Sequence, residues 1–284
     1  PGPFLMTSSP LHLAEGFVQA QALGTVSVKG VPAPVETFSL TGATAVRSRL
    51  QATAARGLTR FVGRDAEMDV LLKALEQARS GRGQVVAVVG EPGVGKSRLV
   101  WEFTHSQHTQ GCLVLEATSM SYGKASTYLP VIDLLKGYFQ IEPRDDARKI
   151  LEKMTGKLLS LDRALESCLT PICWLLDVPT REPEWERQHA AVRRQRLRDS
   201  IRRVLLQESR VQPLVMIFEN LHWIDGETQT LLDSVVEGLP TARVLLFVNY
   251  RPEYIHGWGS KTYYSQVRLD ALSSTTAAKL LQSL

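Results

Sequence analysis

A glycine-rich stretch that ends in a lysine and a serine is the part of this sequence best suited to chemistry. Residues 90–97 read Gly-Glu-Pro-Gly-Val-Gly-Lys-Ser and fit the spacing G-x-x-x-x-G-K-[ST] at every fixed position. Glycines allow the backbone to curl so that successive N–H groups point into one concavity. Such a concavity at the start of a helix binds phosphate. The stretch therefore predicts a site for a nucleoside triphosphate.

The residues of this P-loop have separable predicted roles. Lys96 would reach the β- and γ-phosphates of ATP, and the Ser97 hydroxyl would ligate Mg²⁺. The predicted nucleotide-binding residues are Gly90, Glu91, Pro92, Gly93, Val94, Gly95, Lys96, Ser97, Arg98, Val62 and Gly63. The alternative, a glycine loop with an unrelated lysine, is disfavoured because an apolar strand precedes the loop and an amphipathic segment follows it.

A strand-end acid would complete the site. Glu219 follows the apolar run 214–218 and is predicted to hold Mg²⁺ directly or through water. Many such ATPases carry a second acid next, but here that residue is Asn220. An amide orients water and cannot take its proton, so we expect slow hydrolysis unless another acid such as Asp225 helps. In the alternative interpretation, Glu219 and Asn220 are simply solvated in a turn.

Two further segments are candidates. Arg251 follows the run 243–250, and a bidentate contact there would report the γ-phosphate; an ordinary surface arginine is the alternative. Lys96, Glu219, Asn220 and Arg251 are the predicted catalytic residues. Residues 61–64, Phe-Val-Gly-Arg, would wrap the adenine edge or merely pack a linker onto the domain.

Strands that alternate with helices predict an α/β fold with a parallel sheet. Expected strands are 85–89, 113–116, 214–218, 244–248 and 267–269. Expected helices are 65–79, 97–109, 128–139, 144–161, 164–176, 185–210, 227–237 and 275–284. The helices between residues 128 and 210 would form an insertion between core strands. Before residue 42 we expect a small β-rich piece, with a helix at 11–16 and strands at 25–29 and 34–40.

The amino-acid composition is typical of a globular protein that does not span a membrane. The 284 residues are 44% hydrophobic and 22% charged, as in an ordinary globular protein. No apolar run approaches the roughly 20 residues that cross a bilayer, so no membrane partner is expected. Three cysteines are too few and too badly spaced for a disulfide framework or a zinc site, so a reducing, cytoplasmic location is expected. Cys168 and Cys173 are expected to be core residues. A formal charge of +4 permits nucleic-acid binding without arguing for it.

An arginine series could suggest nucleic-acid binding, but it lacks interleaved aromatic residues. We expect a solvated helix face, formed by Arg193, Arg194, Arg196, Arg198, Arg202 and Arg203.

Four stretches together resemble a known family. They are residues 61–67 (FVGRDAE), 90–97, 218–225 (FENLHWID) and 249–253 (NYRPE). They resemble the STAND/AAA-type P-loop ATPase module that follows the catalytic domain of bacterial class III adenylate/guanylate cyclases, over nearly all of residues 61–284. Residues 13–16, 23–31 and 34–38 are similar to the closing strands of such a cyclase domain.

The resemblance implies a P-loop NTPase sheet of order 5-1-4-3-2. It implies a cyclase remnant at 1–41, a linker at 42–60 and an ATPase domain at 61–284, truncated at its C-terminal end. An attached cyclase domain and downstream helical repeats would be its partners, and nucleotide-dependent oligomerisation is left open. The cyclase's metal-binding residues would precede residue 1, so this chain alone should make no cyclic nucleotide.

These observations favour an ATP- and Mg²⁺-dependent regulatory module in a signalling protein, with slow hydrolysis. The alternative is a transcriptional or origin-recognition-type, DNA-associated ATPase with the same fold. A third interpretation, a nucleotide-binding scaffold without turnover, is kept open by Asn220.

Overall fold

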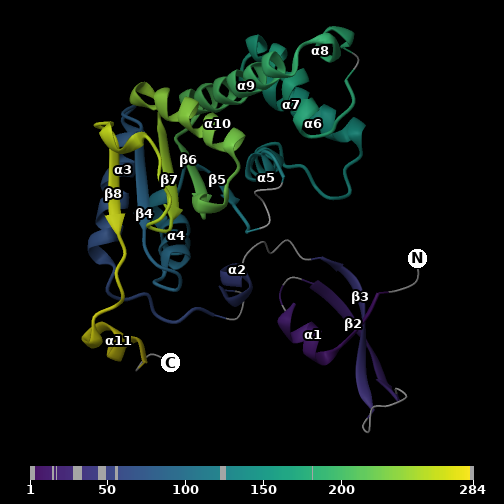
Figure 1. Cartoon of the computed structure of the whole chain (residues 1–284), viewed down its shortest axis with the longest axis vertical. Helices are drawn as coiled ribbons and strands as arrows, with labels where there is room; N and C mark the ends of the chain where they lie inside the picture. Colours follow the sequence, from purple (N-terminus) through teal and green to yellow (C-terminus); the bar gives the residue numbers. More distant parts are fainter. Residues whose placement is uncertain are drawn as a thin grey trace. The chain divides into compact units, whose positions relative to one another are not determined.

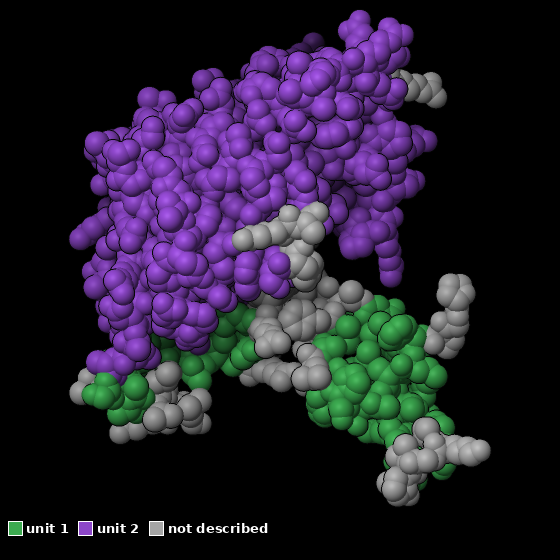
Figure 2. Space-filling view, in the orientation of Figure 1, with its two compact units in different colours: residues 1–62, 274–284 green, residues 63–273 purple. Residues whose placement is uncertain are grey.

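The computed structural model describes residues 4–14, 16, 18–27, 34–43, 49–54, 57–121, 126–180 and 182–281. Its contacts divide the chain into two units, each described here by itself. The first comprises residues 1–62 and 274–284, and the second comprises residues 63–273 (green and purple in Figure 2). The boundaries expected from the sequence, at residues 41 and 60, stay a prediction.

A five-stranded parallel sheet forms the centre of the larger unit (Figure 1). Its strands are β4 (Gln84–Val89), β5 (Leu113–Thr118), β6 (Leu214–Glu219), β7 (Val244–Tyr250) and β8 (Tyr264–Arg268). They lie in the order β5-β6-β7-β4-β8, and every neighbouring pair is parallel. Numbered within the sheet and read from β8, this is 5-1-4-3-2, so the predicted order is confirmed.

The inner strands β4, β6 and β7 are apolar because both faces of the sheet are covered there. The edge strand β8, expected over 267–269, instead begins at Tyr264, because its first residues are polar and give no apolar run. On one face, Val85 and Ala87 of β4 join a buried cluster with residues of α5, α9 and α10. On the opposite face, Phe247 of β7 stacks against Phe103 of α4, with the ring centroids 6.4 Å apart. Helix α3 also packs against β4 and β7. The sheet is therefore enclosed between two helical layers.

The helices of the larger unit are α3 (Asp65–Arg79), α4 (Lys96–Thr104), α5 (Leu129–Tyr138), α6 (Ala147–Leu161), α7 (Leu169–Leu175), α8 (Pro183–Arg187), α9 (Ala190–Val211) and α10 (Gly226–Glu237). Those expected over 65–79, 128–139, 144–161 and 227–237 begin and end within three residues of the expected positions. Short 3₁₀ turns are η1 (Gln107–Thr109), η3 (Arg163–Cys168), η4 (Leu221–Trp223), η5 (Leu239–Thr241) and η6 (Trp258–Ser260). Helices α5 to α9 form the predicted insertion between β5 and β6. Among the described residues, no helix has both the length and the apolar character needed to span a bilayer.

Two of the expected helices have other bounds in the structure: one ends early, and the other begins as a 3₁₀ turn. The helix expected over 97–109 ends at Thr104, where the hydroxyl of Ser106 bonds to the carbonyl of Phe103 at 2.7 Å and caps the last turn. The helix expected over 164–176 begins as the 3₁₀ turn η3, because Pro171 has no N–H to continue an α-helical pattern across the junction.

The expected long helix 185–210 is two helices. Gln188 and His189 have extended backbone angles, with ψ of 144° and 141°, and separate α8 from α9. The imidazole Nδ1 of His189 accepts a hydrogen bond from the N–H of Ala191 at 3.4 Å, so His189 is the N-cap of α9. Cys168 and Cys173 are buried free thiols, as expected for core residues.

The smaller unit contains a three-stranded antiparallel sheet in the order β1-β3-β2. Its elements are β1 (Leu5–Thr7), α1 (Ser8–Leu13), β2 (Val18–Val26), β3 (Val35–Ala43), α2 (Arg49–Ala54) and α11 (Ser274–Leu281). The expected start of a strand at residue 25 is wrong, because β2 begins at Val18. The alanines in its first half obscure the alternation that is typical of a strand. Two register shifts interrupt the pairing of β2 with β3. Strand β1 was not predicted. Residues 15, 28–29 and 282–284 of the expected elements lie outside the described residues.

Candidate nucleotide-binding site

The P-loop occupies the connection between β4 and α4. Gly93 and Gly95 have positive φ angles of 84° and 99°, which glycine adopts without strain. Gly90 is required for a different reason. A Cβ at this position would lie 2.6 Å from the carbonyl oxygen of Leu269 and 2.9 Å from Cγ2 of Val94. The glycines therefore satisfy both the curvature of the loop and its close approach to the end of β8.

Lys96 lies at the first turn of α4 and is directed back onto the loop. Its ammonium group donates hydrogen bonds to the carbonyl oxygens of Gly90 and Glu91, at 2.7 and 2.8 Å. Burial lowers the pKa of Lys96, and the positive charge of Arg251 lowers it further. Two cationic side chains, one at the start of α4 and one directly after β7, thus act on the same region.

Ser97 and Glu219 lie together although 122 residues separate them. The Ser97 hydroxyl donates to Oε2 of Glu219 at 2.6 Å, and the side-chain amide of Asn249 donates to the same oxygen at 3.0 Å. Hydroxyl and carboxylate oxygens are the ligands that Mg²⁺ prefers. These donors therefore fit the predicted metal site.

Asn220 and Asn249 form a second link in this network. The backbone N–H of Asn220 donates to Oδ1 of Asn249 at 2.8 Å, and its side-chain amide donates to the carbonyl of Ser119 at 3.5 Å. Asn220 has a left-handed φ of 61°, which asparagine tolerates better than most residues. The backbone of Asn220 is thus fixed beside Glu219.

Sequence reasoning assigned no role to Asn249, although the structure places it at the centre of this network. Its side chain is fully buried, at 0% exposure, and joins Glu219 to Asn220. The available signal was one polar residue inside the apolar run of β7, VLLFVNY. A buried amide in a strand requires partners, and strand ends of a parallel sheet supply them.

Arg251 follows β7 directly, at the same edge of the sheet. Its guanidinium lies 5.4 Å from the ring centroid of Trp223, and it approaches the carboxylate of Glu253 at 4.0 Å. The indole restricts the guanidinium by a cation–π contact. Its effect on the Lys96 pKa supports proximity to the P-loop, and its role in sensing the γ-phosphate stays a prediction.

Arg64 supports the loop in a way that the sequence did not indicate. One of its guanidinium nitrogens donates to the carbonyl of Val94 at 3.1 Å and to that of Asp270 at 2.6 Å, while the other pairs with Glu67 at 2.9 Å. Arg64 therefore ties the P-loop to the residues that follow β8. The adenine contact expected of Val62 and Gly63 stays a prediction; Gly63 begins the larger unit and Val62 ends a segment of the smaller one.

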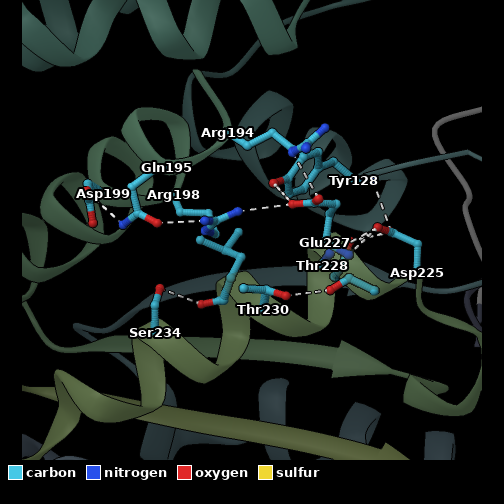
Figure 3. A network of polar contacts seen from close by, with 12 residues as sticks. Tyr128, Arg194, Gln195, Arg198, Asp199, Asp225, Glu227, Thr228, Thr230 and Ser234 are labelled. Carbon is cyan, nitrogen blue, oxygen red and sulfur yellow. Dashed lines mark hydrogen bonds and ion pairs between the residues drawn. The ribbon is translucent and has the colours of Figure 1, made fainter. Parts of the chain in front are cut away.

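Arg98 and Asp225 are engaged in helix contacts. Arg98 pairs with Glu102 one turn further along α4, at 2.7 Å. The carboxylate of Asp225 caps α10, accepting bonds from the N–H groups of Glu227 and Thr228 at 3.0 Å each (Figure 3). Its second oxygen accepts from the N–H of Tyr128 at 3.0 Å. Asp225 is thus a capping residue, which argues against its use as the missing second acid.

The arginine series is not the uniformly solvated face expected from the sequence. Arg194 and Arg198 both pair with Glu227, at 3.2 and 3.1 Å. Arg193 and Arg196 each lie over a tryptophan ring, at 5.5 and 5.3 Å from the centroid. Arg203 donates to the hydroxyl of Ser167 at 3.5 Å, so intramolecular partners contact five of the six side chains.

With the fold and the site in place, comparison with known proteins identifies the family. Residues 60–248, more than half of the chain, match the model of the AAA ATPase domain. The chain belongs to this family of P-loop ATPases.

Individual relatives are more distant. The chain is 24% identical over 279 residues to the uncharacterized protein R02095 of Rhizobium meliloti (strain 1021). The aligned region covers 96% of this chain but 26% of that protein. Among solved structures, it is similar to a STAND protein with a tetratricopeptide repeat sensor from Pyrococcus horikoshii, with 13% identity, a TM-score of 0.38 and coverage of 78% of this chain and 25% of that one. It is also similar to the ORC1 protein of Aeropyrum pernix in complex with DNA, with 13% identity, a TM-score of 0.40 and coverage of 79% and 50%. The chain thus spans half or less of the length of each of these three proteins.

Proposed function

We propose that this chain is the ATP-binding module of a signalling protein, that it hydrolyses ATP slowly, and that its nucleotide state regulates the regions attached to it. The observation that carries the proposal is the 2.6 Å hydrogen bond between Ser97 and Glu219. It joins the end of the P-loop to an acid at the end of a strand two positions away in the sheet. Together with membership of the AAA ATPase family, this supports a site for ATP and Mg²⁺.

The residues of the chain have distinct roles in this proposal. The loop N–H groups and Lys96 hold the phosphates, while Ser97 and Glu219 hold Mg²⁺, which would neutralise phosphate charge. Asn249 keeps the Glu219 carboxylate oriented by donating to Oε2 at 3.0 Å. Asn220 would orient water by its amide and cannot accept a proton from it, which is why the proposed hydrolysis is slow. Arg251 distinguishes ATP from ADP through the γ-phosphate.

A finer proposal concerns the parent protein. The resemblance of residues 13–38 to the end of a class III cyclase domain supports a cyclase as the regulated region, and the small antiparallel sheet β1-β3-β2 is a unit separate from the ATPase. Downstream helical repeats would complete a STAND architecture. Cyclic nucleotide formation by the longer parent tests this part of the proposal; a parent that binds ATP and forms none under any nucleotide condition contradicts it.

The experiment that tests the module itself measures binding and turnover on one sample. Labelled ATP and ADP are titrated with Mg²⁺, and phosphate release is then followed with the wild type, Lys96→Ala and the control Lys73→Ala, an exposed lysine of α3. Loss of a charge-assisted phosphate contact should weaken binding by about tenfold or more in Lys96→Ala only. If the wild type binds neither nucleotide, the proposal fails.

A further inference from the structure

A second pocket lies in the helical insertion, away from the P-loop. It has a volume of about 490 Å³ and is formed by the segment before α5 and by α5, α7, α9 and the start of α10. This size is typical of small-molecule sites. Its described lining includes no residue of 90–97 and neither Glu219 nor Arg251. The pocket is therefore a site distinct from the candidate nucleotide site.

The charges at the pocket wall leave one cation in excess. Of the charged lining residues, Glu227 accepts bonds from Arg194 at 3.2 Å and from Arg198 at 3.1 Å, and the Tyr128 hydroxyl donates to it at 2.9 Å (Figure 3). Glu227 is therefore fully committed to the network drawn there. For Arg193, the described residues provide no carboxylate within ion-pair distance.

Arg193 also has an unsatisfied donor. Its Nε is buried and finds no hydrogen-bond partner among the described residues. A buried N–H without an acceptor is unfavourable, and a guanidinium presents its donors in a planar fork that fits a carboxylate. The chemistry of this side chain therefore matches an anionic group rather than a neutral one.

The part of the pocket wall beside Arg193 is aromatic and aliphatic. Trp174 is 42% exposed, although it is a large apolar side chain, and the Arg193 guanidinium lies 5.5 Å from its ring centroid. Ile132 and Leu175 add apolar surface. The part of the indole that Arg193 leaves open offers aromatic surface against which a flat ring can pack. The cation and the stacking surface are thus adjacent.

We propose that this pocket binds a small aromatic carboxylate. Arg193 receives the carboxylate through its guanidinium fork, and the ring of the ligand packs against Trp174 and Ile132. The pocket walls Tyr128 and Glu227 also contact Asp225, the cap of the helix that follows the Glu219 strand, so the ligand would occupy a position beside an element of the ATPase core. The proposal does not depend on nucleotide binding.

A matched pair of probes tests the requirement for charge. Binding of 4-fluorobenzoate and of neutral 4-fluorobenzamide to the whole chain is followed by ¹⁹F NMR line broadening, and unlabelled acetate serves as a competitor that has the carboxylate without the ring. We expect 4-fluorobenzoate to bind in the millimolar range or tighter, 4-fluorobenzamide to bind about tenfold more weakly or worse, and acetate to compete poorly.

Matched variants test the location. Arg193→Gln should lose about tenfold or more in affinity for 4-fluorobenzoate, because a charge-assisted contact is removed. Arg196→Gln is the control, since Arg196 lies on the same helix over Trp185 at 5.3 Å and does not line the pocket. Trp174→Leu should weaken binding while Arg193 is retained, and the thermal unfolding midpoint of each variant reports its folding.

Four outcomes would overturn the proposal. They are no binding of 4-fluorobenzoate to the wild type, equal binding of the acid and the amide, an Arg193→Gln variant that folds and binds as the wild type does, or an equal loss in Arg196→Gln. If Arg193→Gln does not fold, Arg193→Lys replaces it; this variant keeps the charge but loses the fork, and undiminished binding by it would equally count against the proposal.

Discussion

One carboxylate oxygen organises the candidate ATPase site. Oε2 of Glu219 accepts bonds from Ser97 and Asn249, so the acid is held by the P-loop helix on one side and by the neighbouring strand on the other. Two donors on one oxygen fix the orientation of the carboxylate. Pre-positioning of this kind is what a metal-binding acid requires, and it reduces the reorganisation needed when Mg²⁺ arrives.

Asn220 is the residue at which the rate of hydrolysis can be tested. We predict that Asn220→Asp raises phosphate release by at least about tenfold, because a carboxylate can accept the proton that an amide cannot. The left-handed φ of 61° is one that aspartate also tolerates, so the variant should fold. Phosphate release and ATP affinity are measured on the same samples, and the affinity should change little.

Two results would contradict this prediction. Unchanged release in a folded Asn220→Asp variant would mean that a second acid is not what limits turnover. Rapid release by the wild type would mean that the amide is no handicap.

At the scale of elements, His256 holds the loop after β7 in place through its hydrogen bonds. The Trp258 N–H donates to Nδ1 of His256 at 3.1 Å, and Nε2 lies 2.7 Å from the Tyr250 hydroxyl and 3.2 Å from that of Tyr264. Because Nδ1 accepts, the neutral ring carries its proton on Nε2. Protonation would turn Nδ1 into a donor and break the bond to Trp258.

This loop predicts a pH dependence of stability. Burial lowers the pKa of His256 below its usual 6.5, and the charge of Asp233 opposes part of that effect. The unfolded chain then binds a proton before the folded one does. Stability from this group is fully present above pH 6.5 and is lost as the pH falls through 6.5 toward the lower folded pKa, with a slope of at most about 1.4 kcal/mol per pH unit.

Urea unfolding at pH 5.0 and pH 7.5 measures the effect. The loss of unfolding free energy at low pH should be smaller in His256→Gln, which cannot titrate, than in the wild type. His108→Gln, at an exposed histidine, should behave as the wild type does. An identical pH dependence of His256→Gln and the wild type would show that His256 is not linked to folding.

At the scale of the whole molecule, the two units must communicate if the ATPase is a regulatory module. A ligand shifts a conformational equilibrium only by its differential affinity for the two states. We therefore predict that ATP and ADP, each with Mg²⁺, give different rates of tryptic cleavage in residues 42–60, which contain Arg47, Arg49, Arg56 and Arg60.

Cleavage sites are identified by mass spectrometry under saturating nucleotide. Lys96→Ala should show the same cleavage rate with either nucleotide. Equal rates with ATP and ADP in the wild type, at demonstrated saturation, would remove the switch from the proposed function while leaving ATP binding intact.

Local sequence patterns predicted much of the fold. The helix 65–79 was predicted to the residue, and β4, β6 and β7 were found because buried parallel strands are apolar without alternation. The edge strand β8 was found only in part, because it is largely polar. The start of β2 and the break between α8 and α9 were missed, because alanines in a strand and a histidine N-cap give weak local signals. The 5-1-4-3-2 order came from family resemblance rather than from any pattern in the strands.

The sequence by itself determined the P-loop, since its spacing encodes a backbone shape within eight residues, and it indicated the strand-end acid. Only the tertiary structure decided which distant groups meet. Asn249 contacts Glu219 across 30 residues, and Arg64 bonds to the carbonyl of Asp270 across 206. The pocket around Arg193 and Trp174 likewise exists only where several helices pack together. Periodicity specifies which face of an element is buried, whereas the strand order and helix packing that bring separate faces together depend on the whole chain.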